Sequence, residues 1–253
     1  MNPFIITFIS VVCIFSGALL GMGLHRRLPE YHMSKEMQDL VKLGAGTIAT
    51  LTALVLGLLV SSAKSSYDAV NTGVVQGSAK FIFLDRILAR YGPEAKPVRE
   101  QLKLSLAGAI EKVWPTEKTG VTAVAAIGRG NGMELVQDKL SELTPKSEAQ
   151  RQVLAEAQQL VNDLSQTRWL LLEQAQSQLP TPFLLILILW LVLLFMSFGL
   201  FAPRNWMAHT VLLVVACSLS AAIFLILELS QPLDGFMKIP STPLRYALQQ
   251  MGQ

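Results

Sequence analysis

Residues 43–63 read LGAGTIATLTALVLGLLVSSA, and this stretch decides the fold. It carries no charged side chain, and it has about the ~20 residues that a helix needs to cross the hydrocarbon core of a bilayer. Three similar apolar stretches occupy residues 4–24, 183–202 and 209–229. The sequence therefore predicts an all-α integral membrane protein with four transmembrane helices and a helical extramembrane domain between the second and third.

The charged residues divide the chain into four parts. Charged residues make up 15% of the chain, against about 25% in a typical soluble domain, and most of them lie between the second and third spans. The expected parts are a first helix pair (1–63), a helical extramembrane stalk domain (64–181), a second helix pair (182–231) and a C-terminal tail (232–253). Basic and acidic residues nearly balance in the stalk domain and form no basic stripe, so nucleic acid is not expected as a partner.

The stalk domain has the pattern of helices throughout. No helix-breaking residue separates residue 63 from Gly92-Pro93, so we expect the second span to continue as one helix to Tyr91. Arg90 and Glu94 flank this break and are expected to pair across it. Further helices are expected at 93–114, 133–143 and 146–178, with a glycine-rich loop at 115–132. Apolar side chains left over on this domain, such as Phe81, Phe83 and Trp169, favour contacts with neighbouring subunits.

The second span contains a stripe of small residues at helical spacing. Its members recur every three or four residues and share one face: Gly46, Thr50, Ala53, Gly57 and Ser61. Two interpretations stay open. Small side chains allow close packing between membrane helices, and they also line pores, where hydroxyl groups contact ions.

A second set of candidates is charged. Glu228 ends the fourth span, and an ionisable residue at membrane depth is a candidate for function. By alternation of spans it lies on the same side as Lys64, Asp68, Arg168 and Glu173. The set is interpreted either as a salt-bridge network joining the membrane helices to the stalk or as an ion-entry site. Lys64 and Asp68, four residues apart, could also pair with each other.

No pattern indicates an enzyme, a metal site or a cofactor. The histidines, His25, His32 and His209, lack ligand spacing, and the two cysteines, Cys13 and Cys217, lie inside apolar spans, where a thiol behaves as a small hydrophobe. Nucleotide-binding, zinc-protease and serine-hydrolase motifs do not occur.

Several segments together resemble the bestrophin-like family of bacterial membrane proteins, a domain of unknown function. The resemblance covers almost the whole chain and rests on LGAGTIATLTALVLGLLVSSAKSSYD (Leu43–Asp68), FLDRILARYGPEA (Phe83–Ala95), SFGLFAPRN (Ser197–Asn205) and AIFLILELSQPLDGFMKIPSTPLRYAL (Ala222–Leu248). The likeness of that family to bestrophins implies a pentameric anion channel with a pore lined by the second helix. It thereby implies a homo-oligomer in contact with lipids and inorganic anions, and it places the Gly46–Ser61 stripe at the pore.

Two departures from bestrophins affect what the resemblance implies. The acidic calcium-binding cluster after the last membrane helix is missing, because Ser230–Gln253 contains only Asp234. The second span also lacks the proline and aromatic residues of a bestrophin pore neck. Calcium gating is not expected, because the acidic cluster that would bind calcium is missing.

Localisation is expected at the bacterial inner membrane, with the side of the stalk domain open. Arg26 and Arg27 follow the first span, whereas no basic residue precedes it. The positive-inside rule then favours a periplasmic stalk domain, but the resemblance to bestrophins implies a cytosolic one. The leading functional hypothesis is an anion channel. The alternative is a membrane scaffold or assembly protein whose helical domain binds a partner.

Overall fold

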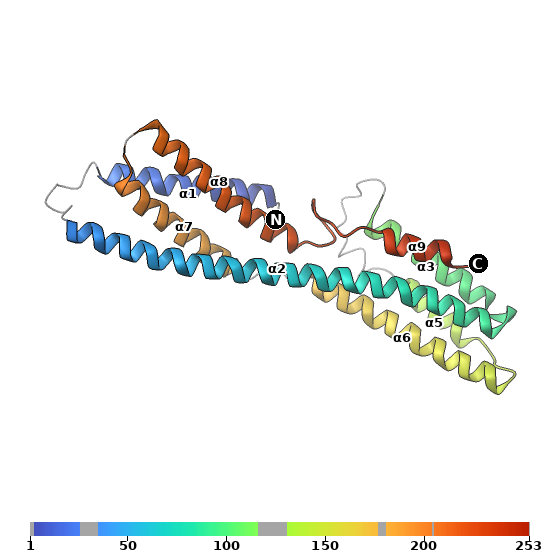
Figure 1. Cartoon of the computed structure of the whole chain (residues 1–253). Helices are drawn as coiled ribbons and strands as arrows, with labels where there is room; N and C mark the ends of the chain where they lie inside the picture. Colours follow the sequence, from blue (N-terminus) through green and yellow to red (C-terminus); the bar gives the residue numbers. More distant parts are fainter. Residues whose placement is uncertain (1–2, 26–34, 116–130, 177–180, 204, 253) are drawn as a thin grey trace. The chain divides into compact units, whose positions relative to one another are not determined.

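Helices account for nearly all the residues that the computed structural model describes, which are 3–25, 35–115, 131–176, 181–203 and 205–252. The elements are α1 (Pro3–His25), α2 (Lys35–Tyr91), the short 3-10 helix η2 (Pro93–Ala95), α3 (Lys96–Val113), α5 (Gly132–Ser141), α6 (Glu148–Gln176), α7 (Thr181–Phe201), α8 (Trp206–Leu229) and α9 (Thr242–Gln250). The described residues contain no strand, so the all-α prediction is confirmed (Figure 1). The expected loop at 115–132 falls mostly outside the described residues.

The chain forms two compact units. Met1–Ser65 and Gln178–Ser230 form the first, called the membrane unit here, and Ser66–Ser177 and Gln231–Gln253 form the second, called the helical unit. Each unit is therefore built from two separated stretches of sequence. The C-terminal segment, which the sequence pattern treats as a tail, belongs to the helical unit.

Within the described residues, four helices are long and apolar enough to span a membrane: α1, α2, the 182–201 part of α7, and α8. Large apolar side chains on them face outward, including Phe8 (70% exposed), Leu54 (66%) and Leu185 (62%). Such an outer surface suits lipid better than water. The four predicted spans thus correspond to four apolar helices.

Glycines bring α1 and α7 close together in the membrane unit. A Cβ atom added at Gly17 would lie 2.7 Å from the carbonyl oxygen of Val192, and one added at Gly21 would collide with the carbonyl oxygen of Met196. From the other side, a Cβ at Gly199 would collide with the backbone of Ala18. This is the small-residue packing that membrane helices use for close approach. It occurs between α1 and α7, whereas the sequence pattern indicated small-residue packing on the second span.

Helix α8 also packs against α1. The rings of Phe4 and Phe224 lie 5.0 Å apart, centroid to centroid. Ile14 of α1 and Ile223 of α8 are fully buried. Since Phe4 is near the start of α1 and Phe224 near the end of α8, these two helices run antiparallel.

The helical unit has a core made by one stripe from each helix. Leu84, Leu102, Val136 and Val161 represent α2, α3, α5 and α6 in this cluster. On α3 the buried residues recur every four positions, as helical periodicity predicts: Val98, Leu102, Leu106 and Ile110. The helical extramembrane domain therefore has its own hydrophobic core.

Helix α2 ends at a glycine whose conformation other residues avoid. Gly92 has φ 124° and ψ −175°, a region that is essentially restricted to glycine. Pro93 follows at the start of η2, and the amide of Ala95 donates to the carbonyl of Gly92 at 3.1 Å. The predicted break at Gly92-Pro93 is confirmed, and its cause is this backbone geometry.

The C-terminal segment is fastened to α3. The indole Nε1 of Trp114 donates to the carbonyl of Ile239 at 2.8 Å, and Lys103 Nζ donates to the carbonyl of Met251 at 3.3 Å. Ala247 of α9 is fully buried, and Met251 nearly so, within the same core as α3. The last residues of the chain are thus part of the helical unit's core.

Candidate functional site

The small-residue stripe of α2 lies on an exposed face of the chain. Gly46, Thr50, Ala53, Gly57 and Ser61 are all exposed. A Cβ added at Gly46 or Gly57 would meet no atom within 4 Å. Close packing within one chain therefore does not explain these two glycines, in contrast to Gly17 and Gly21 of α1. What faces the stripe must come from outside the described chain.

A different face of α2 carries the contacts within the chain. Ala45, Thr52, Leu59 and Ala63 are buried, and at about 3.6 residues per turn they share one side of the helix. The small-residue stripe occupies a face more than a quarter-turn away from them. Helix α2 thus has one face that packs within the chain and another with small side chains that is left open.

The hydroxyl groups of this region donate within the helix. Thr50 Oγ1 donates to the carbonyl of Gly46 at 3.0 Å, and Thr47 Oγ1 donates to that of Leu43 at 3.1 Å. Each hydroxyl therefore presents oxygen lone pairs outward while its proton is engaged. The stripe is polar enough for water but has no charge of its own.

Charged residues lie at both ends of the stripe on the same side of α2. Lys42 and Lys64 are one helical step before and after it, and both are exposed. Each has a carboxylate nearby in the sequence: Asp39 Oδ1 lies 3.5 Å from Lys42 Nζ, and Asp68 follows Lys64 by four residues. The two ends of the stripe therefore carry mixed charge.

Glu228 lies in the last turn of α8 and is 1% exposed. Lys64 belongs to the membrane unit with Glu228, whereas Asp68, Arg168 and Glu173 belong to the helical unit. The guanidinium of Arg168 lies 5.3 Å from the centre of the Trp169 ring, and Glu173 is exposed. Pairing of Glu228 with the charged residues of the helical unit stays a prediction, as does an ion-entry role.

The predicted pairing of Arg90 with Glu94 is wrong. Arg90 Nη2 instead lies 3.1 Å from Glu156 Oε2, and Glu94 Oε1 lies 2.9 Å from Lys146 Nζ. The turn at Gly92 separates the two side chains, so each bonds to a residue in or just before α6. The hydrogen bond from Lys146 lowers the pKa of Glu94 below its ordinary value.

The helical unit contains an ion pair between Asp85 and Arg99 that the sequence pattern did not predict. Asp85 accepts two hydrogen bonds from Arg99, both at 2.8 Å, and a third from the amide of Gly252 at 3.1 Å. Burial by itself would raise the pKa of Asp85, but the bonds from Arg99 and Gly252 outweigh it and lower the pKa. One sequence feature could have indicated this ion pair. Asp85 lies between Leu84 and Leu88, on the face of α2 that holds core residues.

Metal ligands are not gathered anywhere in the described part of the chain. Within it, no group of three or more His, Cys, Asp or Glu side chains could hold an ion. His32 lies outside the described residues. The candidate site is the open face of α2, which carries the small-residue stripe and has charged residues at both ends.

Comparison with known proteins identifies the family to which this chain belongs. The sequence model of the Bestrophin-like domain matches residues 12–244. The chain belongs to the bestrophin-like family. No curated protein matches it.

Solved structures of bacterial bestrophins share the fold of this bestrophin-like protein. One variant of a bacterial Bestrophin homolog from Klebsiella pneumoniae superposes with a TM-score of 0.69 at 13% sequence identity, covering 100% of this chain and 99% of that one. The structure of the Klebsiella pneumoniae homolog solved by Zn-SAD phasing gives 0.67 at 13% identity, covering 97% and 98%. The likeness extends over both units.

Proposed function

We propose that this bestrophin-like protein assembles into an oligomeric channel, a pentamer, whose pore is lined by the small-residue stripe of α2 and conducts inorganic anions. The observation that carries the proposal is the open face of α2, where Gly46 and Gly57 meet nothing within the chain. Small side chains around a symmetry axis leave room for water and ions. Family membership supports the same arrangement. In this role the protein is a passive pathway for anions and not an enzyme.

Exposed apolar residues of the helical unit support self-association. Phe83 is 50% exposed, Trp169 54% and Leu170 53%. Outside the membrane such side chains favour burial against another protein surface. We assign that surface to neighbouring copies. A scaffold that binds a different protein would instead leave the purified protein monomeric or dimeric, which mass photometry in nanodiscs distinguishes from a larger ring.

Cysteine accessibility tests the pore. In a background with Cys13→Ala and Cys217→Ala, single cysteines replace Thr50, Ala53, Gly57 or Ser61, and a membrane-impermeant thiol reagent is applied. The reagent requires the thiolate, so cysteines that face water react and cysteines that face lipid do not.

The matched controls are Leu54→Cys and Leu58→Cys. These positions are 66% and 67% exposed but lie beside the stripe, toward a more apolar surface. We expect fast reaction at the stripe and protection at the two leucines. Equal protection at all six positions would rule out a pore along this face.

Ion selectivity tests the second part of the proposal. Proteoliposomes with a potassium chloride gradient should give a reversal potential near that of chloride. Neutralising the stripe's flanking cations with Lys42→Gln and Lys64→Gln should shift this potential toward zero, because a fixed charge near a pore entrance concentrates its counter-ion. A reversal potential near that of potassium would contradict the assignment to anions.

We place the helical unit on the periplasmic side of the bacterial inner membrane, because Arg26 and Arg27 follow the first span and no basic residue precedes it. The C-terminus reports this side, since α9 packs against α3 in the same unit. Alkaline phosphatase fused after Gln253 should therefore be active in cells. A fluorescent green fluorescent protein fusion at the same position would place the unit in the cytoplasm.

A further inference from the structure

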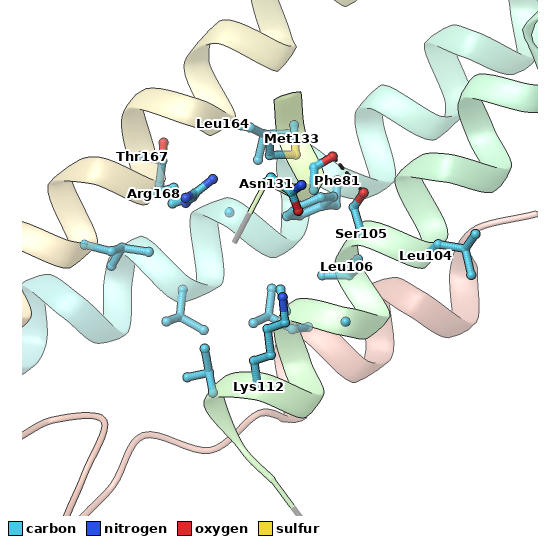
Figure 2. Close-up of a pocket in the computed structure, with 18 of the residues that line it drawn as sticks. Phe81, Leu104, Ser105, Leu106, Lys112, Asn131, Met133, Leu164, Thr167 and Arg168 are labelled. Atoms are coloured by element: carbon cyan, nitrogen blue, oxygen red, sulfur yellow. Dashed lines mark hydrogen bonds between the residues drawn. The ribbon is translucent and has the colours of Figure 1, made fainter. Parts of the chain in front are cut away.

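A cavity of about 330 Å³ opens into the helical unit. Its walls come from α2, α3, α6 and the start of α5, and Leu233 and Leu244 close one side. Figure 2 shows these elements surrounding the space. The volume is at the lower end of the range found for small-molecule sites. At about 30 Å³ per heavy atom of a liquid, it would hold on the order of ten heavy atoms.

Glycines of α2 and α3 contribute to the open space of the cavity. A Cβ at Gly73 would lie 2.6 Å from Leu171 Cδ2, whereas one at Gly77, a buried position one turn later, would meet nothing within 4 Å. Gly108 of α3 likewise faces open space. The helix surfaces thus approach closely at one end of the cavity and stay apart along it. Unfilled apolar space lowers stability in proportion to its volume, so an occupant would stabilise the unit.

Most of the lining is apolar. Val74, Phe81, Leu106 and Leu164 contribute to the walls, and Leu104, which is 67% exposed, contributes to the opening. These side chains offer no charged partner to a ligand. The body of the occupant must therefore be apolar.

The charged residues of the lining are all of one sign. Lys112 of α3 and Arg168 of α6 line the cavity, and none of the described lining residues is an aspartate or a glutamate. Figure 2 shows the two side chains reaching toward the same space from different helices. Asn131 and Gln101 add neutral amide groups. The positive charge of these two lining side chains complements an anionic group, and it disfavours an ammonium group.

We propose that this cavity binds a medium-chain carboxylate of about eight carbons, with its alkyl chain among the apolar walls and its carboxylate between Lys112 and Arg168. Burial of each methylene stabilises the complex, and the two cations select the charge of the head group. The site lies entirely within the helical unit, so the inference is separate from the proposed pore.

Octanoate is the probe for this site. The full-length protein is reconstituted in nanodiscs, and binding of carboxyl-labelled octanoate is titrated by ¹³C NMR, with empty nanodiscs as the background. We expect saturable binding of one octanoate per chain. Octylammonium, with the same chain and the opposite charge, should not bind, and acetate, with the same head group and no chain, should bind at least tenfold more weakly.

Two variants test the location. Gly77→Phe places a ring in the open space and should abolish binding, with Gly77→Val as a smaller replacement if the phenylalanine variant aggregates. Lys112→Gln should weaken binding up to about fivefold, the scale of a solvent-exposed ion pair. Lys96→Gln, on the same helix but away from the cavity, is the matched control and should leave binding unchanged.

The proposal fails if octanoate does not bind to the wild-type protein, which would mean that a neighbouring copy or the protein's own chain fills the cavity. It also fails if octylammonium binds as well as octanoate, or if both Gly77 variants bind like the wild type.

Discussion

Asp85 is a single carboxylate that joins three segments of the helical unit. Its side chain is 5% exposed, and it accepts hydrogen bonds from Arg99 of α3 and from the amide of Gly252 beyond α9. A buried carboxylate is tolerated because several donors satisfy it. The paired charges then fix where α3 and the C-terminal segment lie against α2.

Replacing Asp85 with alanine should destabilise the helical unit strongly. The change leaves Arg99 without its partner in a partly buried place, which costs about 3–5 kcal/mol. For a protein of this size, that corresponds to a lower apparent melting temperature by roughly 6–20 °C. Circular dichroism of the purified protein during heating measures it.

Glu156→Ala is the control for Asp85→Ala, because it breaks the exposed ion pair with Arg90. It should cost less than about 1 kcal/mol. Equal effects of the two substitutions would show that the ion pair at Asp85 contributes no more than a surface pair.

The same residue should make stability depend on pH in the acid range. The pKa of Asp85 is lower in the folded protein than its ordinary value, so its contribution is complete above the unfolded-state pKa of about 4 and is lost as the pH falls through the folded-state pKa. The melting temperature of the wild type should therefore fall more steeply below about pH 4 than that of Asp85→Asn. Parallel curves for the two proteins would contradict this role.

At the scale of elements, two kinds of glycine occur in the membrane helices. Gly17 and Gly21 of α1 allow contact with the backbone of α7, while Gly46 and Gly57 of α2 face open space. Sequence spacing does not distinguish the two kinds, since both recur at intervals that place them on one helix face. The difference depends on which helix lies opposite.

Gly21→Ala should loosen the contact between α1 and α7. Its added methyl group would collide with the backbone at Met196, and overpacking of this kind costs about 1–3 kcal/mol. Gly23→Ala in the same helix meets nothing within 4 Å and should change stability by no more than about 1 kcal/mol. Thermal aggregation in detergent compares the two, and an equally stable Gly21→Ala would refute the close contact.

At the scale of the whole molecule, the chain leaves the helical unit after residue 177 and returns to it at residue 231. The returning segment contributes Ala247 and Met251 to the core and receives hydrogen bonds from Trp114 and Lys103. Completion of this unit therefore requires the last helix of the chain. The contacts span more than a hundred residues, and such long-range closure is costly in loop entropy.

A charge placed on α9 tests this dependence. Ala247→Asp buries an unpaired carboxylate and should expose the helical unit to trypsin in the full-length protein, because an uncompensated buried charge costs several kcal/mol. Gln249→Asp adds the same charge at an exposed position of the same helix and should leave the digestion pattern unchanged. Resistance of Ala247→Asp would show that the unit is complete without α9.

The sequence by itself determined the number of apolar helices, the all-α class and the continuation of the second span to Tyr91, because helix formation and membrane insertion depend on local composition and periodicity. It also marked the stripe from Gly46 to Ser61 as unusual. Tertiary structure decided which face of α2 packs within the chain and left that stripe open. It also brought Asp85 to Arg99 and Gly252 and formed the cavity beside Gly77. These features depend on contacts between residues distant in sequence, and no local pattern encodes which surfaces will meet.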